Sequence, residues 1–150
     1  MVKNNIRKSL LEQGLTLSET FILSSNNKIQ EKFLEYLSTV EFKKILLYSP
    51  YKNEIKLDLV LKKLNEMQKE IFIPKVFPNN ELRFNLLESY NQLIKNKYNI
   101  LESQSNLFVK VEMINVLVVP FLGIDGNGKR LGYGGGYYDR ALGNILSENE

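Results

Sequence analysis

Glycine is concentrated in one stretch of this 150-residue sequence, and that stretch carries its clearest chemical signal. All of the nine glycines except Gly14 lie within or just after the run G-I-D-G-N-G-K-R-L-G-Y-G-G-G-Y-Y-D-R, residues 123–140. Because glycine has no Cβ atom, its backbone amides can turn toward a phosphate and approach it closely. A helix predicted directly afterwards would add free amides and a positive end. The sequence therefore predicts a phosphate cradle at Gly132, Gly134, Gly135 and Gly136, the alternative being a flexible turn without a ligand.

Charged side chains flank this loop and the N-terminus. Arg130, followed less strongly by Lys129, is a candidate for phosphate contact because a guanidinium offers two parallel donors; a solvated loop charge is the alternative. Lys3 and Arg7 are four residues apart on one helix face, so they form either an anion site or an exposed basic face. Asp139 opens the last predicted helix, either as a magnesium ligand or as a carboxylate stabilised by the helix dipole.

Two well-known phosphate loops do not match. The Walker A pattern fits from Gly123 to Lys129, but Arg130 then replaces the required serine or threonine, and more glycines follow where a helix should begin. The dinucleotide fingerprint GxGxxG has no match in this stretch. The loop therefore needs a different interpretation.

The composition restricts the chemistry further. The sequence contains no cysteine and no histidine, which excludes thiol nucleophiles, disulfides, zinc fingers and histidine general bases. Carboxylates, lysine, arginine, tyrosine and backbone groups remain, and these suit phosphate chemistry. The net charge of +3 suits an enzyme of small anions as well as a weak nucleic-acid binder. No apolar run could span a bilayer and no secretory signal is recognisable, so a cytoplasmic protein is expected.

The N-terminal forty residues have helical patterns. Ile6, Leu10 and Leu11 share helical spacing in a first helix that ends at Gly14 and Leu15. Thr16 and Glu19 would then form the capping box of a second helix. The apolar residues that this second helix should turn toward a core are Ile22, Ile29, Phe33 and Leu37.

Strands and helices alternate from residue 43 onward. Residues 44–50 predict a buried strand, 57–69 a helix, and 70–76 a strand stopped by Pro74. Residues 82–87 predict a further strand, 88–112 loops with a short helix, 115–120 a buried strand ending at Pro120, and 137–146 a helix. This order predicts a single α/β domain with a mostly parallel sheet and helices on both faces.

The run R-L-G-Y-G-G-G-Y-Y-D-R, residues 130–140, resembles the signature of the 5-formyltetrahydrofolate cyclo-ligases, also called methenyltetrahydrofolate synthetases. The basic pair at the N-terminus, Tyr48 before a short loop leading to Glu54, and the VVP strand running into Asp-Gly-x-Gly agree with that family. The resemblance implies a single cyclo-ligase-like domain over residues 1–150. The family's pattern continues further, with another strand and an acidic residue, so we expect either a chain that lacks this C-terminal segment or a short member.

The resemblance also implies the reaction and the residues that perform it. ATP would phosphorylate the formyl oxygen of 5-formyltetrahydrofolate, and ring closure would release phosphate and leave 5,10-methenyltetrahydrofolate. Arg130 and Glu54 would be catalytic, Asp139 would hold Mg²⁺, and reduced folate would contact Ser49, Glu54, Tyr133 and Tyr137. The implied ATP-binding residues are Lys3, Asn4, Asn5, Ile6, Arg7, Lys129, Arg130, Leu131, Gly132, Tyr133, Gly134, Gly135, Gly136, Tyr137 and Tyr138.

Other functions remain open at this point. A basic loop rich in glycine and tyrosine could bind nucleic acid, although the charges are mixed along the chain and form no basic stripe. A different ATP- or phosphosugar-binding enzyme of similar fold is distinguished only by the residues 130–140. The preferred hypothesis is a monomeric enzyme that binds ATP and a reduced folate, and neither nucleic acid nor a membrane.

Overall fold

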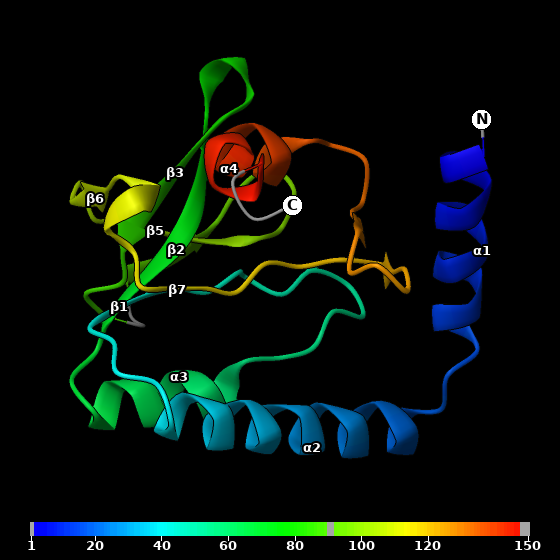
Figure 1. Cartoon of the computed structure of the whole chain (residues 1–150), viewed down its shortest axis with the longest axis horizontal. Helices are drawn as coiled ribbons and strands as arrows, with labels where there is room; N and C mark the ends of the chain where they lie inside the picture. The colour runs from blue at the N-terminus through cyan, green and yellow to red at the C-terminus, as the bar shows by residue number, and fades with distance from the viewer. Residues whose placement is uncertain (1, 90–91, 148–150) are drawn as a thin grey trace.

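The computed structural model describes residues 2–89 and 92–147, and its centre is one mixed sheet. The five strands lie in the order β6-β3-β2-β1-β7. Their bounds are β1 Lys44–Leu46, β2 Glu70–Phe77, β3 Glu81–Leu86, β6 Phe108–Val109 and β7 Val116–Leu117. Figure 1 shows this sheet with helices above and below it.

The expected mostly parallel sheet is wrong. β1 runs parallel to β2 and β7, whereas β3 runs antiparallel to both β2 and β6. The helix α3 (Asp58–Glu66) carries the chain from β1 back to the start of β2, which permits parallel pairing. β2 and β3 are joined instead by the short 3-10 turn η1 (Pro78–Asn80), in which Asn79 and Asn80 have φ of 65° and 60°, and this tight turn makes the pair antiparallel.

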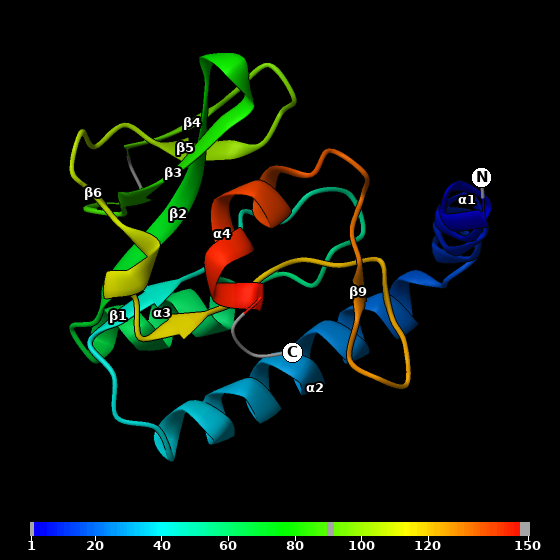
Figure 2. The same ribbon diagram turned by 45° about the horizontal axis from the view of Figure 1, so that its top comes forward.

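Helices cover both faces of the sheet, as expected. On one face, Leu37 from α2 (Glu19–Ser38) and Val60 and Leu64 from α3 pack against Ile45 and Ile71. On the other face, Leu142 from α4 (Tyr137–Ser147) packs against a second cluster, which contains Leu46, Phe72, Phe84 and Ile114. The alternation of buried positions along β1 and β2 thus supplies two separate cores, and Figure 2 shows the backbone of the helices and strands that enclose them.

Several local expectations need correction. Ser18, rather than the pair Thr16 and Glu19, caps α2, because its side chain accepts a hydrogen bond from Phe21 N. Thr16 donates to the carbonyl of Gln13 at the end of the preceding helix. Ile29 is exposed, and the face of α2 directed at α3 carries the buried amides Asn26 and Gln30.

Pro74 does not stop its strand. β2 continues to Phe77, with Pro74 opposite Phe84 of β3. Ile71 O accepts from Leu87 N on the β3 side, so by alternation the nitrogen of Pro74 faces the other side, where β1 has already ended. The missing N–H therefore costs no sheet hydrogen bond.

The segment expected to be loops, residues 88–112, contains more structure than its composition suggests. Apart from residues 90–91, which are outside the described part of the chain, it forms β4 (Leu93–Lys95), β5 (Leu101–Ser103), β6 and the start of η3 (Val111–Met113). β4 and β5 pair as an antiparallel hairpin. β7 is also different from the expected buried strand, since its two residues are only partly buried and lie at the edge of the sheet.

The glycine-rich stretch begins with a second small hairpin. β8 (Gly123–Ile124) pairs with β9 (Arg130–Leu131), and Asp125 organises the turn by accepting from the amides of Asn127 and Lys129. Residues 132–136, which are glycine except for Tyr133, connect β9 to α4.

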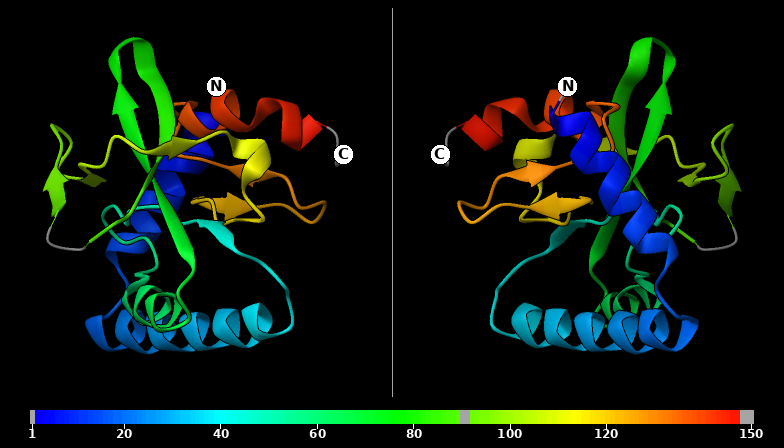
Figure 3. Two further views of the ribbon diagram at one scale, coloured as in Figure 1. Left: turned by 90° about the vertical axis from the view of Figure 1, so that its left-hand side faces the viewer. Right: turned by 90° about the vertical axis from the view of Figure 1, so that its right-hand side faces the viewer.

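The helix α1 (Val2–Leu15) stands apart from both cores and buries none of its residues. Figures 1 and 3 show it lying beside the β8–β9 hairpin and the loop that follows. Its contacts include the hydrogen bond from Arg7 to the Gly132 carbonyl and one from Asn53 to the Gly14 carbonyl. None of the helices in the described ranges is long and apolar enough to cross a bilayer.

Candidate functional site

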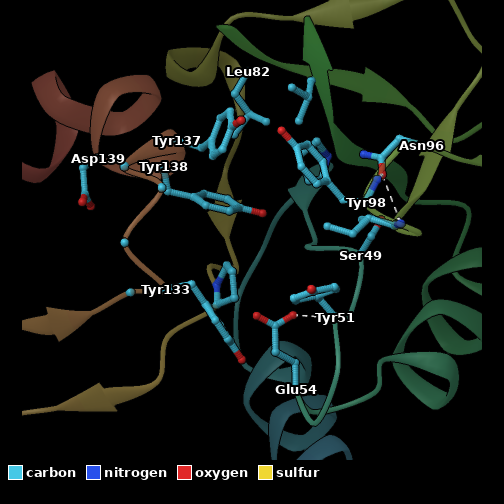
Figure 4. Close-up of a pocket in the computed structure, with 18 of the residues that line it drawn as sticks. Ser49, Tyr51, Glu54, Leu82, Asn96, Tyr98, Tyr133, Tyr137, Tyr138 and Asp139 are labelled. Atoms are coloured by element: carbon cyan, nitrogen blue, oxygen red, sulfur yellow. Dashed lines mark hydrogen bonds between the residues drawn. The ribbon is translucent and has the colours of Figure 1, made fainter. Parts of the chain in front are cut away.

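A cavity of about 400 Å³ opens between the glycine-rich loop on one side and the segment after β1 with the β4–β5 hairpin on the other. Its loop side comprises Gly132 and Gly134–Gly136 with Arg7 and Arg130, and its opposite side comprises Ser49, Tyr51 and Glu54 together with Asn96, Tyr98 and Glu102. Tyr133, Tyr137 and Tyr138 project into the space between them (Figure 4). The glycine-rich segment is therefore directed at a cavity that also meets the N-terminal helix.

The backbone conformation requires glycine at two positions of the loop. Gly134 and Gly136 have φ of 103° and 65°, in the region that residues with a Cβ atom rarely occupy. A Cβ on Gly134 would also lie 3.6 Å from the Arg7 guanidinium. The loop then enters α4 at Tyr137, so that its amides and the positive end of that helix border the same cavity.

Arg7 is the residue of α1 that reaches this cavity. Its Nε donates to Gly132 O at 2.8 Å, and its Nη1 donates to Asn4 Oδ1 at 2.7 Å. The other predicted ATP contacts outside the loop, Lys3, Asn4, Asn5, Ile6, Lys129 and Leu131, do not line the cavity. The basic pair of the sequence thus divides into one residue at the site and one, Lys3, that is solvent-exposed on the helix.

Arg130 and Asp139 are paired with each other. Arg130 Nη2 lies 3.0 Å from Asp139 Oδ1, and the side chains are 17% and 75% exposed, respectively. The Nη1 atom of Arg130 points toward the carbonyl of Pro120 at 3.5 Å. The predicted phosphate-binding cation and the predicted metal ligand therefore stand side by side at the edge of the cavity.

Asp139 could take part in magnesium binding in one specific way. Among the described residues, no group of three or more carboxylates is arranged to hold a metal ion by itself. Mg²⁺ is commonly held by one or two carboxylates together with substrate phosphates and water. An exposed carboxylate beside the glycine-rich loop, the predicted phosphate cradle, fits that kind of site.

Glu54 is the carboxylate on the opposite side of the cavity. Its Oε2 accepts a hydrogen bond from Tyr51 N at 2.7 Å. Burial raises the pKa of Glu54, while the hydrogen bonds from Tyr51 N and the Tyr133 hydroxyl act in the opposite direction. A partly buried carboxylate with remaining acceptor sites can bind N–H groups of a heterocycle.

Aromatic rings border the space between these polar groups. Tyr51 and Tyr133 meet edge to face with centroids 6.3 Å apart. Tyr98 and Tyr137 direct their hydroxyl groups toward one another across the cavity (Figure 4), and the Tyr137 hydroxyl contacts Asn80 Oδ1 at 3.1 Å. Tyr138 packs against both hydrophobic cores, and burial raises the pKa of its hydroxyl. Such rings suit a flat aromatic ligand.

Sequence reasoning missed the residues that the β4–β5 hairpin supplies. Asn96 Oδ1 accepts from the amides of Tyr98 and Ile100, which shapes the turn that presents Tyr98. The buried Glu102 accepts from Asn96 Nδ2 and from Val76 N, which anchors this hairpin to β2. Ser49, which was predicted, donates to the Leu101 carbonyl and fixes the same hairpin to the segment after β1.

Comparison with known proteins places the chain next to one family. The model of the 5-formyltetrahydrofolate cyclo-ligase family matches residues 1–150. A 5-formyltetrahydrofolate cyclo-ligase of Mycoplasma pneumoniae is 30% identical over 144 residues, covering 95% of this chain and 77% of that protein.

Two solved structures have the same fold. A 5,10-methenyltetrahydrofolate synthetase from Mycoplasma pneumoniae superposes with a TM-score of 0.77 at 29% identity, over 95% of this chain and 77% of the other. A 5,10-methenyltetrahydrofolate synthetase from Aquifex aeolicus gives a TM-score of 0.77 at 31% identity, over 95% and 73% of the two chains.

Proposed function

Because the chain belongs to the 5-formyltetrahydrofolate cyclo-ligase family, we propose that it uses ATP to convert 5-formyltetrahydrofolate into 5,10-methenyltetrahydrofolate, with release of ADP and phosphate. One observation carries the assignment of the site. The glycine-rich loop with Arg7 and Arg130 faces Glu54 and a set of tyrosines across a single cavity. A triphosphate and a pterin ring can therefore meet in one place.

The reaction proceeds in two steps. The formyl oxygen on the pterin-ring nitrogen attacks the γ-phosphorus of ATP, and ADP leaves. The side-arm nitrogen then attacks the activated formyl carbon and gives up its proton to solvent, and phosphate leaves with the former formyl oxygen as the methenyl bridge closes. Both steps depend on alignment and on charge neutralisation, so a site without histidine or cysteine can support them.

The phosphate side of the cavity would hold the nucleotide. The amides of Gly132, Gly134, Gly135 and Gly136 provide donors, and the start of α4 adds its positive end. Arg7 and Arg130 supply the cations, with guanidinium groups that can bind phosphate oxygens in pairs. Mg²⁺, bound by Asp139 together with phosphate oxygens, would neutralise charge on the transferring phosphoryl group.

The opposite side of the cavity would hold the reduced folate. The Glu54 carboxylate can accept hydrogen bonds from N–H groups of the pterin, while Tyr98 and Tyr138 border the path that its ring would take. Ser49 lies beside this path, but its hydroxyl is already committed to Leu101 O, so its contribution is to position the β4–β5 hairpin.

Coupling of nucleotide consumption to folate tests this proposal. Phosphate release from magnesium-ATP should require 5-formyltetrahydrofolate and should equal the methenyl product mole for mole. Folate without a formyl group serves as the control and should release no phosphate. Phosphate release at the same rate with and without 5-formyltetrahydrofolate would rule out this reaction and favour a different ATP-binding enzyme.

A further inference from the structure

Tyr133 is the only residue with a side chain between Gly132 and Gly136. It follows Gly132 and precedes Gly134, whose φ of 103° bends the backbone at that point. Because its loop neighbours have no side chains to restrain them, the position of the Tyr133 ring depends directly on the backbone of the loop. A ligand that fixes the loop will therefore fix this ring.

The ring of Tyr133 leaves the loop and meets the opposite side of the cavity. It packs edge to face against Tyr51 at an interplanar angle of 73°. Its hydroxyl group is directed toward the carboxylate of Glu54 (Figure 4), and the two groups interact electrostatically. Tyr51 N donates to the same carboxylate at 2.7 Å, so two donors, one of them carried by the loop, converge on Glu54.

Tyr133 is also placed where three parts of the chain meet. Together with Glu54 and Pro120 it lines both the site cavity and a second cavity of about 850 Å³ beneath α1. The carbonyl of the preceding Gly132 accepts from Arg7 Nε at 2.8 Å. A nucleotide phosphate bound by Arg7 and the loop amides would fix the backbone on both sides of Tyr133, and with it the position of the Tyr133 ring.

From these contacts we infer that Tyr133 is a positioning residue that couples the two substrates. It transmits the binding of nucleotide at the glycine-rich loop to the orientation of Glu54, so that nucleotide and reduced folate bind cooperatively. This inference rests on the proposed function, because it assigns nucleotide to the loop and folate to Glu54. Coupling of this kind is reciprocal, since each ligand must change the affinity for the other by the same factor.

The test measures the dissociation constant of 5-formyltetrahydrofolate with and without a non-hydrolysable ATP analogue and Mg²⁺. In the unaltered protein the analogue should tighten folate binding about tenfold, the order expected for one hydrogen bond to a charged group. Tyr133→Phe keeps the ring contact with Tyr51 but removes the hydroxyl group. The ratio of the two constants should fall to near one, with an unchanged melting temperature.

Tyr36→Phe is the matched control. It also removes a tyrosine hydroxyl, but from an exposed position on α2 that lines neither cavity, so the ratio should stay at the value of the unaltered protein. A second variant, Glu54→Gln, should reduce the ratio by itself. The double variant Tyr133→Phe with Glu54→Gln should show no further reduction, because both changes interrupt one connection.

The outcomes separate this inference from the proposed function. The coupling role is overturned if the ratio of the two folate dissociation constants is unchanged in Tyr133→Phe, or if it is one in the unaltered protein. Either result overturns it even if methenyl product is formed. A lower melting temperature together with an equal loss of folate affinity with and without the analogue assigns Tyr133 a structural role only. Absence of both folate binding and product formation in the unaltered protein would refute the proposed function itself.

Discussion

The Nε atom of Arg7 donates a hydrogen bond to the carbonyl oxygen of Gly132, 125 residues further along the chain. This contact joins a helix that buries none of its residues to the loop that connects β9 and α4. The cation thus reaches the glycine-rich loop from the other end of the sequence. A phosphate site assembled in this way depends on the docking of α1 as well as on the glycines.

Replacement of Arg7 should weaken nucleotide binding specifically. Arg7→Ala removes a guanidinium group at the cavity together with the link to Gly132, so we expect the KM for ATP to rise about tenfold or more. The neighbouring Lys8→Ala is the control, because Lys8 is exposed and faces Glu12 at 3.9 Å. Steady-state kinetics compare the two variants. Equal effects of both changes would show that α1 contributes no specific contact.

Replacement of Arg130 and replacement of Asp139 should change different kinetic quantities, although the two side chains form an ion pair. Arg130→Ala removes a cation from the transferring phosphate and should reduce kcat by about 10²–10³. Asp139→Asn should mainly raise the concentration of Mg²⁺ needed for half-maximal rate. The pair itself is largely exposed on the Asp139 side, so either change should alter the free energy of unfolding by less than about 1 kcal/mol.

Magnesium titrations and thermal unfolding of both variants check this prediction. Arg83→Ala, which breaks the Arg83–Glu81 pair at the start of β3, is a control for loss of a surface ion pair. An unchanged magnesium titration in Asp139→Asn would remove Asp139 from the metal site. An unchanged turnover in Arg130→Ala would remove Arg130 from the mechanism.

Glu54 should make folate binding and stability depend on pH in opposite directions. Burial raises its pKa in the folded protein, so protonation as the pH falls through that raised value should weaken folate binding. The same shift means that the folded protein loses stability as the pH rises from the ordinary glutamate pKa through the raised one. Glu54→Gln should therefore bind folate poorly but be relatively more stable at neutral pH.

Thermal unfolding of both proteins at pH 4 and pH 7 tests the stability half of this prediction. The advantage of Glu54→Gln over the unaltered protein should be larger at pH 7, where the buried carboxylate is charged. An advantage that does not change with pH would show that burial of charge at Glu54 is unimportant.

The left-handed backbone of the loop makes a separate prediction. Gly134→Ala places a Cβ on a residue with φ of 103°, which should cost roughly 1–2 kcal/mol or shift the loop, and in either case weaken ATP binding. Gly126→Ala is the matched control, because Gly126 has open space around its Cβ position and no positive φ. Equal ATP affinities in the two variants would contradict the role of the loop geometry.

Local patterns in the sequence predicted the elements that are determined locally. The helices α1, α3 and α4 and the strand β3 follow their apolar spacing, and they lie where they were expected. The short strands β4 and β5 depend on distant partners: Glu102 holds them to β2, and Ser49 bonds to Leu101. Strands of only three residues are too short to show a periodicity, so the sequence pattern does not separate them from loops.

The residues of the candidate site also fall into two groups, those that the sequence predicted and those that it missed. The glycine-rich signature and its resemblance to a known family identified the loop, Arg7, Arg130, Glu54 and Asp139, and the structure brings these residues to one cavity or its edge. Tyr51 and Tyr98 were missed because isolated tyrosines are usually core residues, and no motif separates them. Their roles depend on the folding of β4–β5 and of the segment after β1 over the cavity, which is non-local.

The central claim is that one cavity brings ATP and 5-formyltetrahydrofolate together for ring closure. The most direct measurement mixes the protein with magnesium-ATP and 5-formyltetrahydrofolate and follows the absorbance of the methenyl product. The absorbance should rise with time in proportion to protein concentration, and the rise should disappear when ATP is left out. Tight binding of both compounds without any methenyl product would contradict the account.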